Sequence, residues 1–255
     1  SIIIKDALGK VVRQFSSLAD SLFVAYAGGP SPEPVLSKGK GLNRFVWNLR
    51  YPTIPGATGV YIEASFDGHK AAPGNYSVVL KRGDQELNTQ FEILPNPLYE
   101  LDAKAYADYH SVMHKMETEL TEMHRLVNSL HDKQLQLGQL LSNLPADENY
   151  KAIKSNAQAL LKQMKQWDED MVQRKSKAYD DVENFPNKFT AEYLFLINHT
   201  ESDIPKPNQP SLDRLEELNA AWKTLHARAI QMLDTEIPSL NKQLWDAGVG
   251  AIWKK

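Results

Sequence analysis

The sequence contains no cysteine. Disulfide frameworks, thiolate zinc sites and cysteine nucleophiles are therefore excluded together, although this does not fix the compartment, since exported and cytosolic chains both manage without disulfides. No apolar run approaches the roughly eighteen residues that a membrane helix requires, so we expect no membrane span. The first residues also lack the charged and then apolar pattern of a signal peptide. They read SIIIK, which is typical of a strand already under way, and we expect a piece of a longer protein.

An excess of charge of one sign is also lacking. The 29 Lys and Arg residues face 32 Asp and Glu residues, which gives a formal net charge of −3 at pH 7. Such a balance disfavours nucleic acid and anionic membranes as partners. We find no glycine-rich phosphate loop, nucleophile elbow or catalytic-triad spacing. What remains is ordinary globular material of 255 residues, 42% hydrophobic and 24% charged, which is enough for two modest cores.

Residues 1–94 predict short strands separated by glycine and proline turns. The segment IIIKDALGKVVRQF has two β-branched runs around an Asp and Gly turn, as in a hairpin. The segment GLNRFVWNLRYP alternates so that Phe45, Trp47, Leu49 and Tyr51 share one face of a predicted strand, with Trp47 in the core. VYIEASFDGHK predicts a further strand, and AAPGNYSVVLKRGDQELNTQFEILPNP predicts a second hairpin around Arg-Gly-Asp. Together they indicate a small antiparallel sandwich.

The segment LPNPLYE marks a boundary, because two nearby prolines stop a strand and cannot continue a helix. Beyond it the hydrophobic period changes from two to about three and a half, which predicts one helix of roughly forty residues. A second apolar stripe runs over residues 153–171. A third runs over residues 212–233, with Ser211 as the expected N-cap. Pro238 lies inside the pattern that continues from it, so we expect a kink or restart there.

The segments KDALGKVVRQF, GLNRFVWNLRYP and AAPGNYSVVLKRGDQELNTQFEILPNP together resemble a known arrangement. They look like the C-terminal Ig-like strands that follow the β-propeller in large secreted bacterial proteins with BNR or sortilin-type repeats, which are often labelled glycosyl hydrolases. They also resemble the Ig-like domain of the flagellar hook-capping protein. SDIPKPNQPS and LNKQL stand where the propeller family has SDxPPT and L-N-x-x-L. Asn48 departs from the Asp usual after the Trp, and PKPNQP departs from PPT.

This resemblance implies an α+β fold of two domains. We expect an N-terminal Ig-like antiparallel β-sandwich at residues 1–97, followed by an antiparallel three-helix bundle of long helices at residues 98–255. The implied function is a non-catalytic structural and interaction region at the C-terminus of a larger exported propeller protein, secreted or periplasmic. Its implied partners are the propeller of the same parent chain and a glycan or protein. The alternative function is a carbohydrate-binding β-sandwich module with a helical spacer.

Histidines on the first long helix form the most suggestive cluster. His110, His114, Glu117, His124 and His131 fall on one flank, and HSVMH places two imidazoles one turn apart, as metal ligands often are. No glutamate directly follows the first histidine, so the metalloprotease HExxH motif is not present. Because the sequence shows no acid that would hold the imidazole rings in place, we interpret the flank as packing beside the heptad seam. His110, His114 and Glu117 remain the candidate metal ligands.

Acidic residues cluster at three places among Lys and Arg, at residues 168–170, 180–181 and 216–217. Glycoside hydrolysis needs two carboxyl groups facing each other across a cleft. Clusters at helical spacing indicate solvated helix faces instead. We therefore expect no catalytic residue, no cofactor and no bound metal in this chain.

Overall fold

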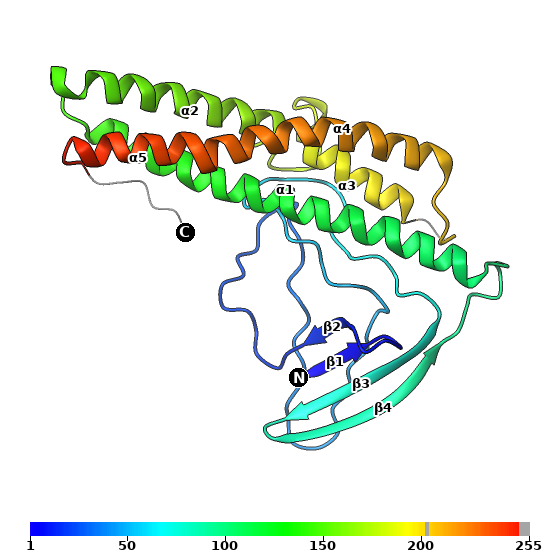
Figure 1. The fold of residues 1–255 in the computed structure, drawn as a ribbon. Helices are drawn as coiled ribbons and strands as arrows, with labels where there is room; N and C mark the ends of the chain where they lie inside the picture. The colour runs from blue at the N-terminus through cyan, green and yellow to red at the C-terminus, as the bar shows by residue number, and fades with distance from the viewer. Residues whose placement is uncertain (202–203, 250–255) are drawn as a thin grey trace.

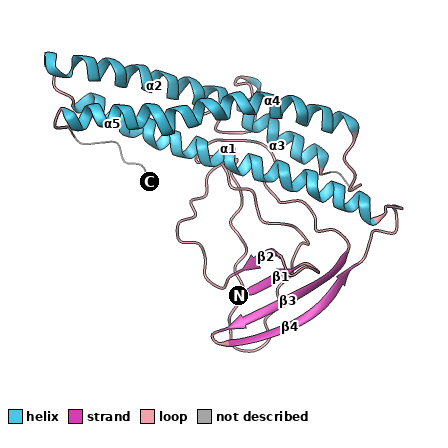
Figure 2. Ribbon diagram, in the orientation of Figure 1, coloured by secondary structure: helices cyan, strands magenta, loops and turns pink. Residues whose placement is uncertain are grey.

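The computed structural model describes residues 1–201 and 204–249, and within them the chain has an α+β fold. A small antiparallel sheet lies to one side of an elongated layer of helices (Figures 1 and 2). Ser202 and Asp203 of the SDIPKPNQPS motif lie outside the described residues, as do residues 250–255.

The sheet contains β1 (Ile2–Lys5), β2 (Val11–Phe15), β3 (Gly74–Arg82) and β4 (Gln85–Ile93) in the order β2-β1-β3-β4, and every neighbouring pair is antiparallel. Both predicted hairpins are present. In the first turn, the Asp6 carboxylate accepts from the backbone N–H groups of Leu8 and Lys10, each at 2.9 Å, and Gly9 supplies a φ of 78°. In the second, Gly83 takes a φ of 56°, which residues other than glycine rarely adopt.

The predicted strand in GLNRFVWNLRYP is wrong, because the structure forms only an isolated bridge there, between Arg50 and Lys70. Leu49 has a φ of 58°, which breaks the extended backbone and leaves its side chain 39% exposed. Trp47 nevertheless packs against the sheet, edge-on to Tyr76 and at 6.3 Å between ring centroids. Its indole N–H donates to the Arg50 carbonyl oxygen at 2.9 Å. The alternation therefore predicted the shared packing but not the backbone.

VYIEASFDGHK is likewise irregular rather than a strand. Within the described residues there is one sheet, and a second sheet of the expected sandwich is not formed. Irregular chain over residues 16–73 occupies the space between this sheet and the helices (Figure 1). The backbone groups of these residues must find partners other than a strand ladder.

The predicted long helices are present. α1 (Ala103–Asn143) has 41 residues, and its N-cap Asp102 accepts from the Ala105 N–H at 2.8 Å. α2 (Lys151–Met171) follows a short 3-10 turn at Glu148–Tyr150. α4 (Gln209–Gln231) begins earlier than expected, because Asn208 rather than Ser211 is the N-cap and accepts from the Ser211 N–H. A π-helical turn at Met232–Glu236 joins α4 to α5 (Ile237–Asp246), which is the restart that Pro238 indicated.

The sequence reading missed α3 (Phe189–Thr200), which follows a 3-10 turn at Tyr179–Glu183. Its sequence FTAEYLFLINHT shows no single apolar stripe because the helix is enclosed on several sides. Tyr193, Leu194 and Ile197 are all at most 1% exposed. Within the described residues, α3 is therefore a helix beyond the expected three, the third of which is divided into α4 and α5.

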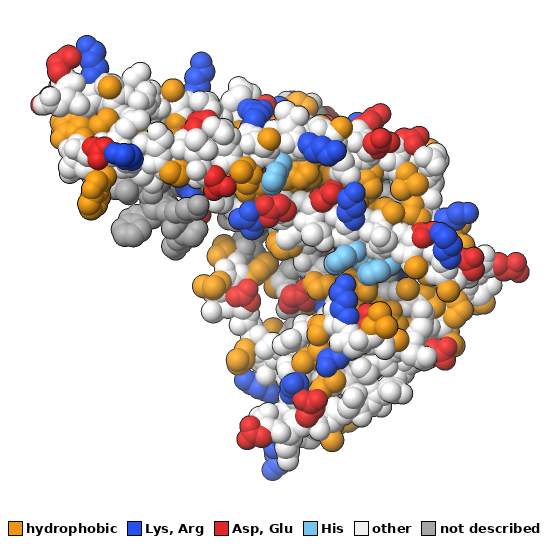
Figure 3. All heavy atoms as spheres, viewed as in Figure 1, with side chains coloured by type: hydrophobic (Ala, Val, Ile, Leu, Met, Phe, Trp, Pro, Cys, Tyr) orange, Lys and Arg blue, Asp and Glu red, His pale blue; other side chains and the backbone are white. Residues whose placement is uncertain are grey.

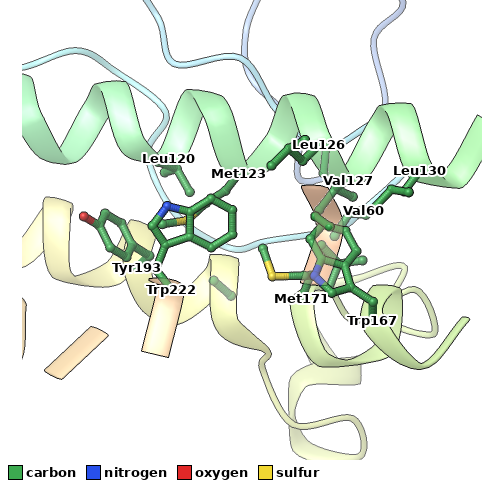
Figure 4. Close-up of a cluster of buried hydrophobic side chains, with 14 of the residues drawn as sticks. Val60, Leu120, Met123, Leu126, Val127, Leu130, Trp167, Met171, Tyr193 and Trp222 are labelled. Carbon is green, nitrogen blue, oxygen red and sulfur yellow. The ribbon is translucent and has the colours of Figure 1, made fainter. Parts of the chain in front are cut away.

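Two hydrophobic cores form, and the larger one includes residues from outside the helices. Ile54, Ala57, Val60, Ile62 and Phe66 are buried in the same cluster as the inward faces of α1, α2, α3 and α4. Figure 4 shows Val60 among the side chains of the helical core. A smaller cluster, which includes the sheet residues Ile4, Val12, Phe15 and Tyr76, forms the second core. Residues 54–66, although N-terminal to the proline boundary, thus pack as part of the helical core.

The surface carries mixed charges. Lys and Arg side chains alternate with Asp and Glu over the face drawn in Figure 3, in keeping with the formal net charge of −3. Among the described residues, no helix combines the length and the apolar character that crossing a membrane requires.

Residues 54–66 offer a direct test of this packing. Phe66 is 5% exposed and lies 6.1 Å from the His124 ring of α1, measured between centroids. Phe66→Ala should lower the free energy of unfolding by about 3–5 kcal/mol, as truncation of a buried aromatic residue does. The exposed Leu22→Ala should change it by less than about 0.5 kcal/mol. Urea unfolding followed by circular dichroism measures both, and a cost below about 1 kcal/mol for Phe66→Ala would show that this segment is dispensable to the helices.

Candidate functional site

The flank of α1 predicted from the histidine spacing faces the irregular N-terminal segment. His110 and Glu117 contact His69, and His124 contacts Pro55. His114 is exposed beside His110. The flank is therefore the face on which residues 50–69 dock, a role that its position beside the heptad seam did not reveal.

Glu117 and His69 form the centre of this contact. His69 is completely buried, and its backbone N–H donates to Glu117 Oε1 at 2.7 Å. His69 Nδ1 lies 2.9 Å from both carboxylate oxygens. A carboxylate only accepts hydrogen bonds, so Nδ1 carries the hydrogen and the tautomer of His69 is fixed. One buried side chain of α1 thus holds both the backbone and the ring of His69.

His110 extends this series of hydrogen bonds. Its Nδ1 lies 2.7 Å from His69 Nε2. When both rings are neutral, His69 Nε2 has only a lone pair to offer, so His110 Nδ1 donates and His110 Nε2 is left as an acceptor. Burial, together with the nearby His69, His114 and Lys10, lowers the pKa of His110 to about 4, against a smaller opposing effect of Glu117. The geometry and the charges both favour a neutral His110.

Aromatic rings enclose the hydrogen-bonded residues Glu117, His69 and His110. Tyr51 stacks on His69 with 4.3 Å between ring centroids and an angle of 12°, and it also contacts His110 at 5.1 Å. Tyr109 meets His69 edge-on at 6.1 Å. Burial raises the pKa of Tyr51 above its usual range. His110 and Tyr51 also line an open cavity of about 400 Å³ at the start of α1, together with Tyr106.

Gly68 allows this arrangement. A Cβ atom at residue 68 would lie 2.5 Å from the Pro52 carbonyl oxygen and 2.6 Å from that of Tyr51, so only glycine fits between the two chain segments. The Tyr51 N–H donates to the His69 carbonyl oxygen at 2.9 Å across the same contact. The dipeptide Gly68-His69 was the available sequence signal for this site, but we had assigned it to a strand and did not single out His69.

Further along α1, polar side chains take up the backbone groups of residues 55–58. His124 Nδ1 donates to the Pro55 carbonyl oxygen at 2.6 Å. Asn128 accepts from the Thr58 N–H at 2.7 Å and donates to the Gly56 carbonyl oxygen at 3.2 Å. These bonds stand in for the strand ladder that this segment lacks.

α3 holds the next part of the segment in the same way. Asn198 accepts from the Ser65 N–H at 2.8 Å and donates to the Ser65 carbonyl oxygen at 2.9 Å. Arg50 forms an ion pair with Glu201 at 3.2 Å and donates to the Gly68 carbonyl oxygen at 2.9 Å. The sequence pattern did not predict this role of Asn198, because its partner Ser65 is 133 residues away along the chain.

The expected solvated acids need one correction. Asp168 is 6% exposed, and Arg174 donates to its two oxygens at 2.6 and 2.7 Å. This bidentate pair closes the end of α2, so Asp168 is structural rather than part of a solvated face. Asp170 pairs with Arg228. The cluster at residues 168–170 therefore offers no facing pair of free carboxylates.

The candidate metal residues are partly brought together. His110 and His114 stack one turn apart, with 5.7 Å between ring centroids, but Glu117 is joined to His110 only through His69. In residues 1–201 and 204–249, no group of three or more His, Asp or Glu side chains is arranged to hold a metal ion. A cavity of about 850 Å³ between α2 and α4 lies away from this chemistry, lined by residues such as Lys162, Gln166 and Lys223.

Comparison with known proteins found no family model, no curated protein and no solved structure that matches this chain. The interpretation of the candidate site therefore rests on the geometry of its residues.

His124 generates a pH prediction. It is fully buried, and burial lowers its pKa to about 4, against the opposing hydrogen bond to Pro55. In the unfolded chain a histidine takes up a proton below about pH 6.5, whereas the folded chain resists until about pH 4. This group therefore stabilises the fold fully above pH 6.5 and loses about 3 kcal/mol of that contribution as the pH falls to 4.

Replacing His124 by Asn keeps a donor for the Pro55 carbonyl oxygen and removes the titration. His124→Asn should lose about 2–3 kcal/mol less stability than the parent chain between pH 7 and pH 4. Urea unfolding at the two pH values measures the difference. Equal losses in both proteins would show that His124 does not resist protonation.

Proposed function

We propose that this chain is a non-catalytic structural and interaction module, the C-terminal region of a larger exported protein that carries a β-propeller on its N-terminal side. The observation that carries the proposal is the docking of residues 50–69 onto α1 and α3 through the buried His69 and Glu117 pair. This contact joins the chain between β2 and β3 to the helices. The motifs quoted above support the relationship to the propeller proteins and an Ig-like ancestry for the sheet.

A fixed joint suits a spacer that holds its neighbours apart. Adjoining domains move relative to each other by default unless a large apolar interface joins them. Here Val60, Ile62 and Phe66 are buried within the helical core itself. A rigid connection of this kind would fix the orientation of a domain that adjoins the sheet relative to a partner that binds the helices.

The interaction surface we favour is the loop region between β2 and β3. Leu18, Leu22 and Leu42 are 70%, 87% and 100% exposed there. Several strongly exposed apolar side chains in one loop region favour a surface that a partner covers. The partner proposed is the propeller of the same parent chain.

The alternative, a carbohydrate-binding module, has weaker support. Sugar recognition by stacking needs aromatic rings that face solvent. Trp47 contacts Tyr76 and Phe91 edge-on, and Tyr76 is 7% exposed. The strongly exposed rings, Tyr179 and Trp245, lie in the helical part and not on the sheet.

The experiment begins with the reading frame upstream of Ser1. We expect it to encode propeller repeats and an export signal. The upstream region, expressed separately, should bind this chain in a calorimetric titration. Leu22→Asp/Leu42→Asp should weaken that binding at least about tenfold, as loss of exposed apolar contacts does at an interface.

The control is Leu98→Asp/Leu135→Asp, which adds the same charge at two exposed leucines outside the loop region and should leave binding unchanged. Chromogenic glycosides incubated with the chain should give no turnover. An upstream frame without repeats would overturn the propeller relationship, and turnover by the isolated chain would overturn the non-catalytic function.

A further inference from the structure

His110 presents one ring nitrogen that no hydrogen bond within residues 1–201 and 204–249 engages. Its Nδ1 lies 2.7 Å from His69 Nε2, which leaves its Nε2 to face the cavity or solvent. The ring is half-buried and lines an open cavity. His114 lies one helical turn further along, exposed, with its ring nearly parallel to that of His110 at an angle of 15°.

We propose that His110 and His114 chelate a divalent transition-metal ion, and that Glu117 and His69 form the second shell that orients His110. Residues at i and i+4 share one face of a helix, so two imidazoles at this spacing reach one ion. The exposed His114 side chain is free to turn towards an ion held at His110 Nε2. Water completes the coordination, because the protein offers two ligands here and no larger group.

The sequence did not reveal the residues that orient His110. A metal-binding histidine usually donates its other ring N–H to an acceptor that is itself held in place. His110 Nδ1 points at His69 Nε2 at 2.7 Å, and Glu117 holds His69 from behind at 2.9 Å. Glu117, a candidate ligand from its spacing, therefore does not bind the ion in this proposal. It orients His110 through His69.

The chemistry of the ligands selects the ion. Imidazole suits zinc, nickel and copper, whereas calcium and magnesium require several oxygen ligands. Both oxygens of Glu117 already face His69, so this carboxylate is not offered to a hard cation. Lys10, whose side chain is exposed, is a nearby cation that opposes binding.

The test uses tag-free protein and the metal alone. Calorimetric titration with zinc, nickel and copper chlorides should show one ion per chain, and copper should bind most tightly by the general order of affinities. His114→Ala alters only an exposed side chain, so it leaves the fold intact and should abolish stoichiometric binding. His199→Ala/His226→Ala removes two imidazoles elsewhere and should leave binding unchanged.

A substitution of Glu117 tests the residues that orient His110. Glu117→Gln should weaken metal binding by about 10- to 100-fold, the usual effect of losing an outer-shell partner. Electron paramagnetic resonance of a stoichiometric copper sample should show two nitrogen ligands in the parent chain, and this signal should be absent from His114→Ala. This readout does not depend on the stability of the Glu117 variant. Absence of binding, or binding that persists in His114→Ala, would overturn the site.

Discussion

The carboxylate of Glu117 accepts hydrogen bonds from both the backbone N–H and the ring of His69 inside a region that excludes water. A buried carboxylate is costly unless donors surround it, and a hydrogen bond to a charged group contributes about 1.5–3 kcal/mol. His69 supplies those donors from an otherwise irregular segment. The position of residues 50–69, and with it the placement of the sheet on the helices, depends on this pair.

The same logic extends along the docking face. Residues 54–66 bury apolar side chains in the helical core but form no strand, so their backbone groups need partners. His124, Asn128 and Asn198 provide them from α1 and α3. Apolar burial thus favours the docking, and the polar side chains fix its register. Similar polar residues on a helix face without a facing segment would simply meet water.

The helices could be predicted well from the sequence, because a heptad stripe over forty residues has no other explanation. The hairpins could be predicted for a similar reason, since Asp6, Gly9 and Gly83 mark the turns. The strand around Trp47 could not, because period-two alternation reports a shared face and not the positive φ of Leu49. α3 escaped detection because a helix enclosed on several sides lacks a stripe.

Half of the site was visible in the sequence. The spacing of His110, His114 and Glu117 predicts that they share a flank of one helix, and all three lie in α1. The partner was not visible, because His69 is 48 residues away from Glu117 in the sequence and only the fold brings them together. Without an acid behind the histidines, the flank looked like packing. The structure adds the missing partner and shows why a charged residue is buried on that face.

The most direct test of this account is native-state hydrogen exchange at the His69 amide. This N–H is bonded to a side chain and not to a strand, so its protection depends wholly on the docking to Glu117. The account predicts that it opens with the same free energy as amides in the middle of α1, as expected for one cooperative unit. Rapid exchange at His69 while α1 stays protected would contradict it, because the sheet and helices would then be separate units.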